Sequence, residues 1–225
     1  MYKNGFHLFL CAILLLTPVL FVSCGTEPEV VTQPGILRVV LQADPTDTSI
    51  EILGQTTTVG DDDSLGVSIF QGKAIALDDR FAILFKDVET ATQEQCDFNL
   101  LSRPDGEFER HVIFESFAPA GDYKGISIGI EGIHMSIGAF EIPVELPADD
   151  DAIMVFLGNY RVLERQVTEV TIQLKAFESM SRFLDSFVFD RVAAISEIKV
   201  LPESEFNELV KDLPPLVNPN IPYQP

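Results

Sequence analysis

Apolar and polar residues alternate over many short segments of the chain between residues 35 and 202. An alternation of period two puts apolar side chains on one face of a β-strand and polar side chains on the other. The pattern predicts many half-buried strands and few helices. The apolar positions are Leu37, Val39 and Leu41; Phe81, Ile83 and Phe85; Phe108, Val112 and Phe114; Ile126, Ile128 and Ile130; Phe140, Ile142, Val144 and Leu146; Val170, Ile172 and Leu174; and Ile198 and Val200.

The breaks between these segments carry turn-forming residues, at 103–106, 119–122 and 147–149. Proline, glycine and aspartate favour such turns. Short strands that end in turns at intervals of roughly 8 to 12 residues are typical of an antiparallel β-sandwich or barrel. We therefore expect an all-β, antiparallel β-sandwich over residues 35–202.

Two segments depart from the alternation and predict short helices. Apolar residues recur at spacings of three and four in residues 177–187, which favours a helix that covers an open end of the sandwich. A second helix is expected from Glu205 to Leu213 with Ser204 as its N-cap. Residues 214–225 contain five prolines, which disfavour regular structure. Residues 203–225 are therefore expected to consist of this short helix and a proline-rich tail.

The first 23 residues have the features of a secretory signal peptide. Lys3 precedes an almost wholly apolar stretch at residues 6–22, which is shorter than the roughly 20 residues of a membrane-spanning helix. The residues Phe21, Val22, Ser23 and Cys24 resemble the lipobox of bacterial lipoproteins. That resemblance implies that residues 1–23 are removed and that Cys24 is acylated. An ordinary secreted protein with an incidental cysteine is the alternative.

Residues 24–34 form a short polar segment with two prolines, as expected for a tether between the acylated Cys24 and the domain. Several acyl chains anchor a protein stably where one would not. Gly25 follows the cysteine, whereas aspartate there resembles an inner-membrane retention signal. The expected location is therefore the outer membrane of a bacterial cell envelope, and either leaflet fits.

Charge narrows the classes of partner. The chain has 225 residues with 35 acidic and 15 basic side chains, and its formal net charge is -20. Removal of residues 1–23 takes away Lys3 and no acid. An acidic surface repels phosphate backbones, so nucleic-acid binding is not expected. Of three cysteines, Cys11 leaves with the signal peptide and Cys24 carries lipid, so Cys96 is expected to be a packed thiol without a disulfide partner.

Clusters of aspartate are the candidate metal ligands. Asp61, Asp63, Asp149 and Asp151 lie in acidic runs between strands, and calcium prefers oxygen ligands of this kind. The spacing does not match an EF-hand. One hypothesis is that two acidic loops meet at one end of the sandwich and bind Ca²⁺. The alternative is that these are solvated turns that keep strand edges apart, and no other cofactor is expected.

Candidate catalytic residues are few. Ser127 lies in a G-x-S-x-G sequence, but the residues after it continue a strand pattern and do not start the helix that a nucleophile elbow needs. The two histidines of the exported chain, His111 and His134, fall on polar strand positions without other ligands at metal-binding spacing. The sequence therefore favours a protein that is not an enzyme.

Three short motifs resemble known domains. Residues 35–41 with Asp44 and Pro45, then residues 97–101, and then residues 119–123 resemble an uncharacterised domain of bacterial lipoproteins. Residues 105–108 and 118–123 resemble transthyretin-like and carboxypeptidase-regulatory-like sandwiches. These resemblances imply an immunoglobulin-like or transthyretin-like sandwich and bring no catalytic residue.

The functional expectation combines these features. The chain is expected to be a lipid-anchored, non-catalytic module of the cell envelope that binds or scaffolds another macromolecule, either an envelope protein or a glycan. The alternatives are a calcium- or carbohydrate-dependent binding module, with Tyr123, Tyr160 or aromatic residues of the loops as platforms, and, third, a hydrolase.

The anchor leads to a direct prediction. Replacing Cys24 with serine is expected to release the protein from membranes and to abolish fatty-acid labelling, because the acyl chains supply the membrane affinity. Membrane flotation and metabolic labelling measure both effects. Unchanged flotation of the Cys24→Ser chain would contradict the lipoprotein interpretation.

Overall fold

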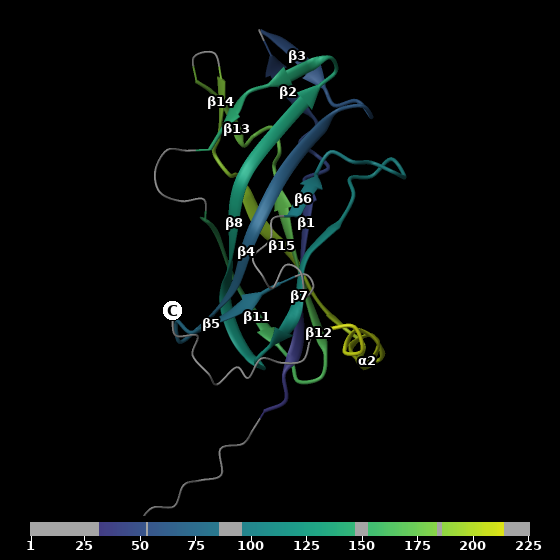
Figure 1. Cartoon of the computed structure of the whole chain (residues 1–225), viewed down its shortest axis with the longest axis vertical. Helices are drawn as coiled ribbons and strands as arrows, with labels where there is room; N and C mark the ends of the chain where they lie inside the picture. The colour runs from purple at the N-terminus through teal and green to yellow at the C-terminus, as the bar shows by residue number, and fades with distance from the viewer. Residues whose placement is uncertain (1–31, 53, 86–95, 147–152, 184–185, 214–225) are drawn as a thin grey trace, which may run out of the picture. The chain divides into compact units, whose positions relative to one another are not determined.

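The computed structural model describes residues 32–52, 54–85, 96–146, 153–183 and 186–213 (Figure 1). The chain divides into two compact units, Met1–Val31 and Thr32–Pro225. The predicted signal peptide, Cys24 and the first part of the predicted tether lie outside the described residues, as do Asp149 and Asp151. Among the described residues, no helix is both long enough and apolar enough to span a bilayer.

The described part of the chain consists mainly of strands. The strands are β1 (Gly35–Ala43), β2 (Ser49–Ile52), β3 (Gln55–Thr58), β4 (Ser64–Ala76), β5 (Phe81–Leu84), β6 (Cys96–Asn99), β7 (His111–Ala118), β8 (Gly121–Ile137), β9 (Phe140–Ile142), β10 (Val144–Glu145), β11 (Ile153–Val162), β12 (Val167–Leu174), β13 (Met180–Phe183), β14 (Ser186–Phe189) and β15 (Ala193–Leu201), and the helix is α2 (Glu203–Leu209). The all-β prediction is confirmed.

Two large sheets form the sandwich. Sheet I has four strands in the order β15–β12–β1–β7, and sheet II has six, in the order β11–β8–β4–β5 with β6 paired to β4 and β9 paired to β8. Figure 1 shows β4 and β8 in front of β1 and β15. A hairpin of β2 and β3 and a small sheet in the order β10–β14–β13 complete the described strands.

The pairing is not wholly antiparallel. In sheet I, β1 and β12 run parallel, with Ile36 opposite Val167 and Ala43 opposite Leu174, and β10 and β14 are also parallel. Parallel neighbours need a long connection between them. Here the connection from β1 to β12 includes all of sheet II. A local alternation pattern carries no information about such a pairing.

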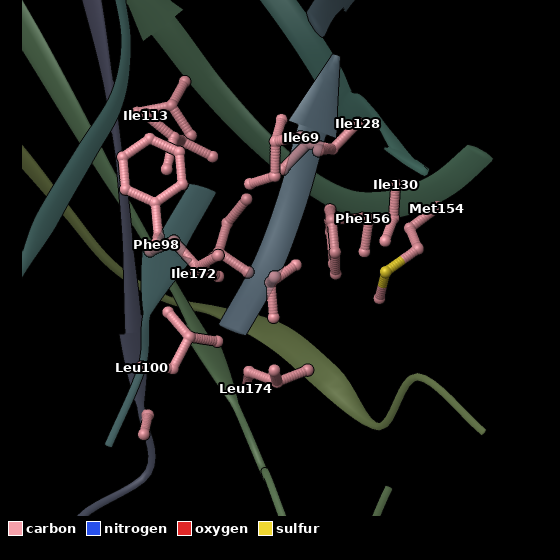
Figure 2. Packing of buried hydrophobic residues seen from close by; sticks show 14 of the residues in the cluster. Ile69, Phe98, Leu100, Ile113, Ile128, Ile130, Met154, Phe156, Ile172 and Leu174 are labelled. Atoms are coloured by element: carbon pink, nitrogen blue, oxygen red, sulfur yellow. The ribbon is translucent and has the colours of Figure 1, made fainter. Parts of the chain in front are cut away.

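The core lies between the inner faces of the two sheets. Leu37, Val39 and Leu41 of β1 are buried as predicted, and they join one cluster with Ile126 and Ile128 of β8. Figure 2 shows side chains from both sheets in this core, among them Ile69, Ile128 and Phe156 of sheet II and Ile172 and Leu174 of sheet I.

The sheets meet closely where Phe114 of β7 lies against Gly72 of β4. A Cβ at Gly72 would come within 2.5 Å of the Phe114 ring. This glycine therefore gives the aromatic ring the space it needs between the layers.

The predicted helix over 177–187 is wrong. Residues 175–180 form a tight turn, in which Ser179 N–H donates to the Lys175 carbonyl at 2.9 Å, and the chain then enters the hairpin of β13 and β14. The Asp47 carboxylate accepts the Phe177 N–H at 2.7 Å and stabilises the beginning of this turn. The apolar residues of one turn and of the two strands after it have spacings of three and four, which resemble those of a helix.

The second predicted helix is present but displaced. Helix α2 begins at Glu203, two residues before the predicted start, and its N-cap is Pro202 without a side-chain cap, so Ser204 does not have that role. Phe206 is buried against Ile36 and Val167 on the outer face of sheet I. This contact decides where the helix forms, because so short a helix depends on tertiary packing.

Arg38 organises the outer face of sheet I. Its side chain points away from the core, between its cross-strand partners Glu115 on β7 and Glu169 on β12. Its Nε lies 2.5 Å from Glu115 Oε2, and its Nη1 lies 3.5 Å from both Glu169 Oε2 and Glu205 Oε1 of α2. Burial lowers the pKa of Arg38, while the hydrogen bond and charge of Glu115 raise it, and the net effect is a pKa above the ordinary value.

A substitution of this arginine is expected to destabilise the domain. The side chains of Arg38, Glu115 and Glu169 are only 14%, 17% and 9% exposed, so Arg38→Met leaves the poorly hydrated Glu115 carboxylate without its cation and leaves Glu169 with Arg110 alone. We expect a loss of about 3 kcal/mol in the free energy of unfolding, measured by urea denaturation. The control is Arg80→Met. It removes an ion pair whose arginine is 86% exposed and is expected to cost less than about 1 kcal/mol. Equal losses in the two variants would contradict this account.

Candidate interaction face

The outer face of sheet II carries exposed apolar side chains on three strands. We call the set Ile75, Phe81, Ile83, Ile153, Val155 and Leu157 the apolar face. The strand register places them in rows across the sheet. One row runs from Leu157 through Gly125 and Ile75 to Phe81, and the next runs from Val155 through Ser127 and Lys73 to Ile83.

These side chains are unusually accessible for large hydrophobic residues. The exposed fractions are 58% for Phe81, 47% for Ile83, 39% for Ile153, 54% for Val155 and 77% for Leu157. Single exposed hydrophobic residues are common on soluble proteins, but a contiguous group across several strands marks an interaction site. In Figure 1 the outer side of β4 and β8 is turned toward the viewer.

No carboxylate occupies the outward positions of these rows. The polar members are Ser127, Lys73 and Gln71. The Lys73 ammonium lies 5.1 Å from the centroid of the Phe81 ring, within the range of a cation–π contact. In a chain with 35 acidic side chains, an acid-free surface of this extent stands apart from the outer face of sheet I, which carries Glu115 and Glu169.

A bulge extends the apolar face along β4. The register between β4 and β8 shifts between Ile69 and Gln71, so Phe70 has no direct partner. Its ring covers Gly129 of β8, where a Cβ would come within 2.6 Å of it. Phe70 therefore adds a partly buried aromatic side chain beside Ile153.

The other half of the same sheet face is polar. Ser68 of β4 lies opposite Asp97 of β6 and Gly132 of β8, and its hydroxyl donates to the Asp97 carboxylate. His134 is exposed two residues beyond Gly132. Ser68 is only 2% exposed, so this contact is inaccessible to a substrate.

The sequence-based candidates for catalysis do not come together. Ser127 lies in the middle of β8 between Lys73 and Val155, so the strand–turn–helix of a nucleophile elbow is absent there. His134 lies seven residues further along the same strand, roughly 23 Å away. His111 Nε2 lies 2.9 Å from the Asn99 carbonyl oxygen, so this ring has a structural hydrogen-bond partner.

The tyrosines considered as binding platforms lie in the core instead. Tyr123 and Tyr160 are 4% and 5% exposed, and their rings stack with centroids 5.4 Å apart. Their hydroxyls donate to the carbonyls of Pro119 and Gly125. Burial raises the pKa of Tyr123 to about 12 and raises that of Tyr160 further. The platform hypothesis is therefore wrong for both residues.

The described acidic candidates have structural contacts. Asp63 is 6% exposed, and its carboxylate accepts the Gly60 N–H at 2.5 Å and the Gly138 N–H at 2.7 Å. Asp61 is exposed and lies 3.3 Å from Arg103. Asp149 and Asp151 belong to the residues that are not described. Across the described ranges, no three histidine, cysteine or acidic side chains form a group able to hold a metal ion.

Comparison with protein-family models, with curated proteins and with solved structures finds no match to this chain. The resemblance to lipoprotein and transthyretin-like domains therefore stays a prediction from short motifs.

The sequence contained a signal for the apolar face that the alternation analysis did not use. Residues 81–84 are Phe, Ala, Ile and Leu, and residues 153–157 are Ile, Met, Val, Phe and Leu. An uninterrupted apolar run is typical of a strand covered on both faces. In the described structure, the core covers only one face of β5 and β11.

The Asp63 contacts yield a stability prediction. Asp63→Ala leaves the N–H groups of Gly60 and Gly138 without their acceptor, and we expect a loss of about 2 kcal/mol in unfolding free energy. Asp61→Ala, at a side chain 94% exposed, is expected to change it by less than about 0.5 kcal/mol. Thermal melts in millimolar calcium and in chelator measure both variants. A calcium-dependent rise in melting temperature that both substitutions abolish would assign these side chains to a metal instead.

Proposed function

We propose that the protein is a lipid-anchored, non-catalytic module of the bacterial cell envelope that binds another macromolecule through its apolar face. The observation that supports this most is the acid-free set of exposed Phe81, Ile83, Val155 and Leu157, whose two halves are connected across sheet II by the row through Gly125 and Ile75, on a chain of net charge -20. Water-exposed hydrophobic area of this kind is unfavourable unless a partner covers it.

The chemistry of the face indicates a protein partner. Its rows combine branched aliphatic side chains with one aromatic ring at the β5 edge and one cation, Lys73. Protein interfaces have such an apolar centre depleted of acids. A glycan site would combine exposed aromatic rings with several hydrogen-bonding side chains, whereas Phe81 is the one aromatic ring in these rows, most of its apolar neighbours are aliphatic, and Tyr123 and Tyr160 are buried.

The charges on the two outer faces of the sandwich also favour the apolar face as the docking surface. A partner that approaches the outer face of sheet I meets Glu115 and Glu169 in their ion pairs with Arg38 and Arg110. A partner that approaches the apolar face meets Lys73 as the one ionised group of its rows. The charge distribution therefore favours one docking surface over the other for an apolar partner.

Site-specific photo-crosslinking tests the proposal. A photoreactive amino acid at Val155 in the native cell is expected to give one discrete adduct, because Val155 is 54% exposed and lies between Ile153 and Leu157 on the β11 side of the face. The matched control is Phe140, an exposed apolar residue of β9 with an exposed fraction of 67%. We expect no adduct from that position.

A charge substitution makes the test specific. Ile83→Glu lies in the same row as Val155 and introduces a carboxylate at a side chain that is already 47% exposed, so the fold should persist. We expect at least a tenfold loss of the Val155 adduct. Equal adducts from Val155 and Phe140, or an adduct insensitive to Ile83→Glu, would contradict a docking role for this face. A melting temperature raised by sugars would favour the glycan alternative.

A further inference from the structure

The end of the sandwich at which β1 begins also carries three turns. Gly35 lies against Val162 and the Leu163 carbonyl at the end of β11. Gly35 is also opposite Ala118, where β7 ends. The Leu77 N–H donates to the Asp122 carbonyl at 3.2 Å, which brings the turn after β4 to the same place. We call the turns at residues 77–80, 119–121 and 163–166 the tether end.

The tether end combines an exposed apolar side chain with paired cations. Leu77 is 57% exposed in its turn. Four basic side chains lie in the three turns and at the strand ends next to them, and each has an acidic partner. The pairs are Arg80 with Asp78 at 2.7 Å, Lys124 with Asp79, Arg161 with Asp122 at 3.7 Å, and Arg165 with Glu203 at 3.0 Å. With Glu164 of the third turn, five acidic and four basic side chains lie here, so this end is only weakly acidic.

The opposite end of the sandwich is strongly acidic. It contains the turn that follows β3, the start of β9 and the loop that precedes β7, as the contacts of Asp63 with Gly138 and of Arg103 with Val59 show. Its described acidic residues include Asp44, Asp47, Glu51, Asp61, Asp62, Asp63, Asp105, Glu107, Glu109, Glu141 and Glu145, and the basic residues of the same loops and strands are the fewer Arg103, Arg110, Lys175, Arg182 and Arg191. Figure 1 shows β5, β7 and α2 at one end and β2, β3, β13 and β14 at the other.

We propose that the tether end rests on the phospholipid leaflet that holds the acyl chains, with Leu77 in the interfacial region and the arginines and Lys124 of this end near lipid phosphates. This inference rests on the proposed anchor at Cys24. Anionic phospholipids repel the acidic end more than the weakly acidic tether end, and this difference acts over about 8 Å at physiological ionic strength.

The tether permits this contact without imposing it. Residues 24–34 reach at most roughly 40 Å when fully extended, so the domain can turn freely unless one end is attracted to the bilayer. The exposed Leu77 provides that attraction by apolar burial at the membrane surface, and the low net charge of this end keeps its repulsion from anionic lipids smaller than that of the opposite end. The apolar face belongs to the side of sheet II and stays available to a partner.

Tryptophan fluorescence tests this orientation, because the chain contains no tryptophan. Leu77→Trp places one tryptophan at the tether end, and Phe140→Trp places one at the acidic end, at positions 57% and 67% exposed. The lipidated variants are reconstituted in vesicles of phosphatidylethanolamine and phosphatidylglycerol with brominated acyl chains. We expect Leu77→Trp to shift to shorter wavelength and to lose at least roughly half of its emission, and Phe140→Trp to be unaffected.

Failure of the anchor and failure of the orientation have different signatures. If Cys24 is not acylated, the chain does not float with vesicles. The same variants, attached to nickel-chelating lipids by a hexahistidine tag in place of residues 1–24, then report the orientation alone, since Thr32–Pro225 is a compact unit. Equal quenching at both positions, or none at Leu77→Trp, overturns the proposal.

Amide hydrogen exchange of the unsubstituted chain gives a second measure that needs no variant. Exchange at residues 77–80 and 163–166 is expected to slow on vesicles, whereas exchange at residues 138–140 is expected to stay the same. Uniform slowing at both ends, or no change at residues 77–80, contradicts a specific membrane-facing end.

Discussion

The negative charge of the chain is the constraint on which the arrangement of its surfaces depends. With 35 acidic and 15 basic side chains, most carboxylates must stay in water or share a cation. Arg38 is the clearest case, because it lies between Glu115 and Glu169 on the central strand of sheet I and also reaches Glu205 of α2. One guanidinium thus compensates acids from three different elements at a place where water is largely excluded.

This use of cations makes the two outer faces of the sandwich different. Sheet I alternates acids and bases across its strands, with Lys199 opposite Glu169 and Arg38 opposite Glu115, and part of its face is covered by Phe206 of α2. Sheet II has no helix on its outer face among the described residues, and its apolar rows lack acids. A sheet in an acidic protein would normally carry acids on its solvent side, so their absence there is a property of the face itself.

The sequence predicted the strands and the core of β1 and β8 well, because alternation at Leu37 and Ile126 reports a face directly. It could not assign a face to β5 or β11, where consecutive residues such as Ile153 and Met154 are all apolar. It also missed the parallel pairing of β1 with β12, which depends on segments far apart in the chain. The helix expected over 177–187 failed because a turn and a hairpin, stabilised by Asp47, imitate helical spacing. The apolar face was missed because most of its side chains belong to β5 and β11, and an uninterrupted apolar run does not reveal which side of a strand is exposed.

The apolar face and the tether end lie in different directions on sheet II. The apolar face is the outward side of the strands, whereas Leu77 lies in the turn between β4 and β5, where its N–H donates to the Asp122 carbonyl. The plane of a sheet is roughly perpendicular to the surface at the ends of its strands. If the tether end meets a bilayer, the apolar face therefore stands upright on the membrane and faces sideways. A partner that binds Val155 and Ile83 then approaches along the membrane surface. This direction avoids the acidic end, where Asp61 and Asp62 would otherwise face it.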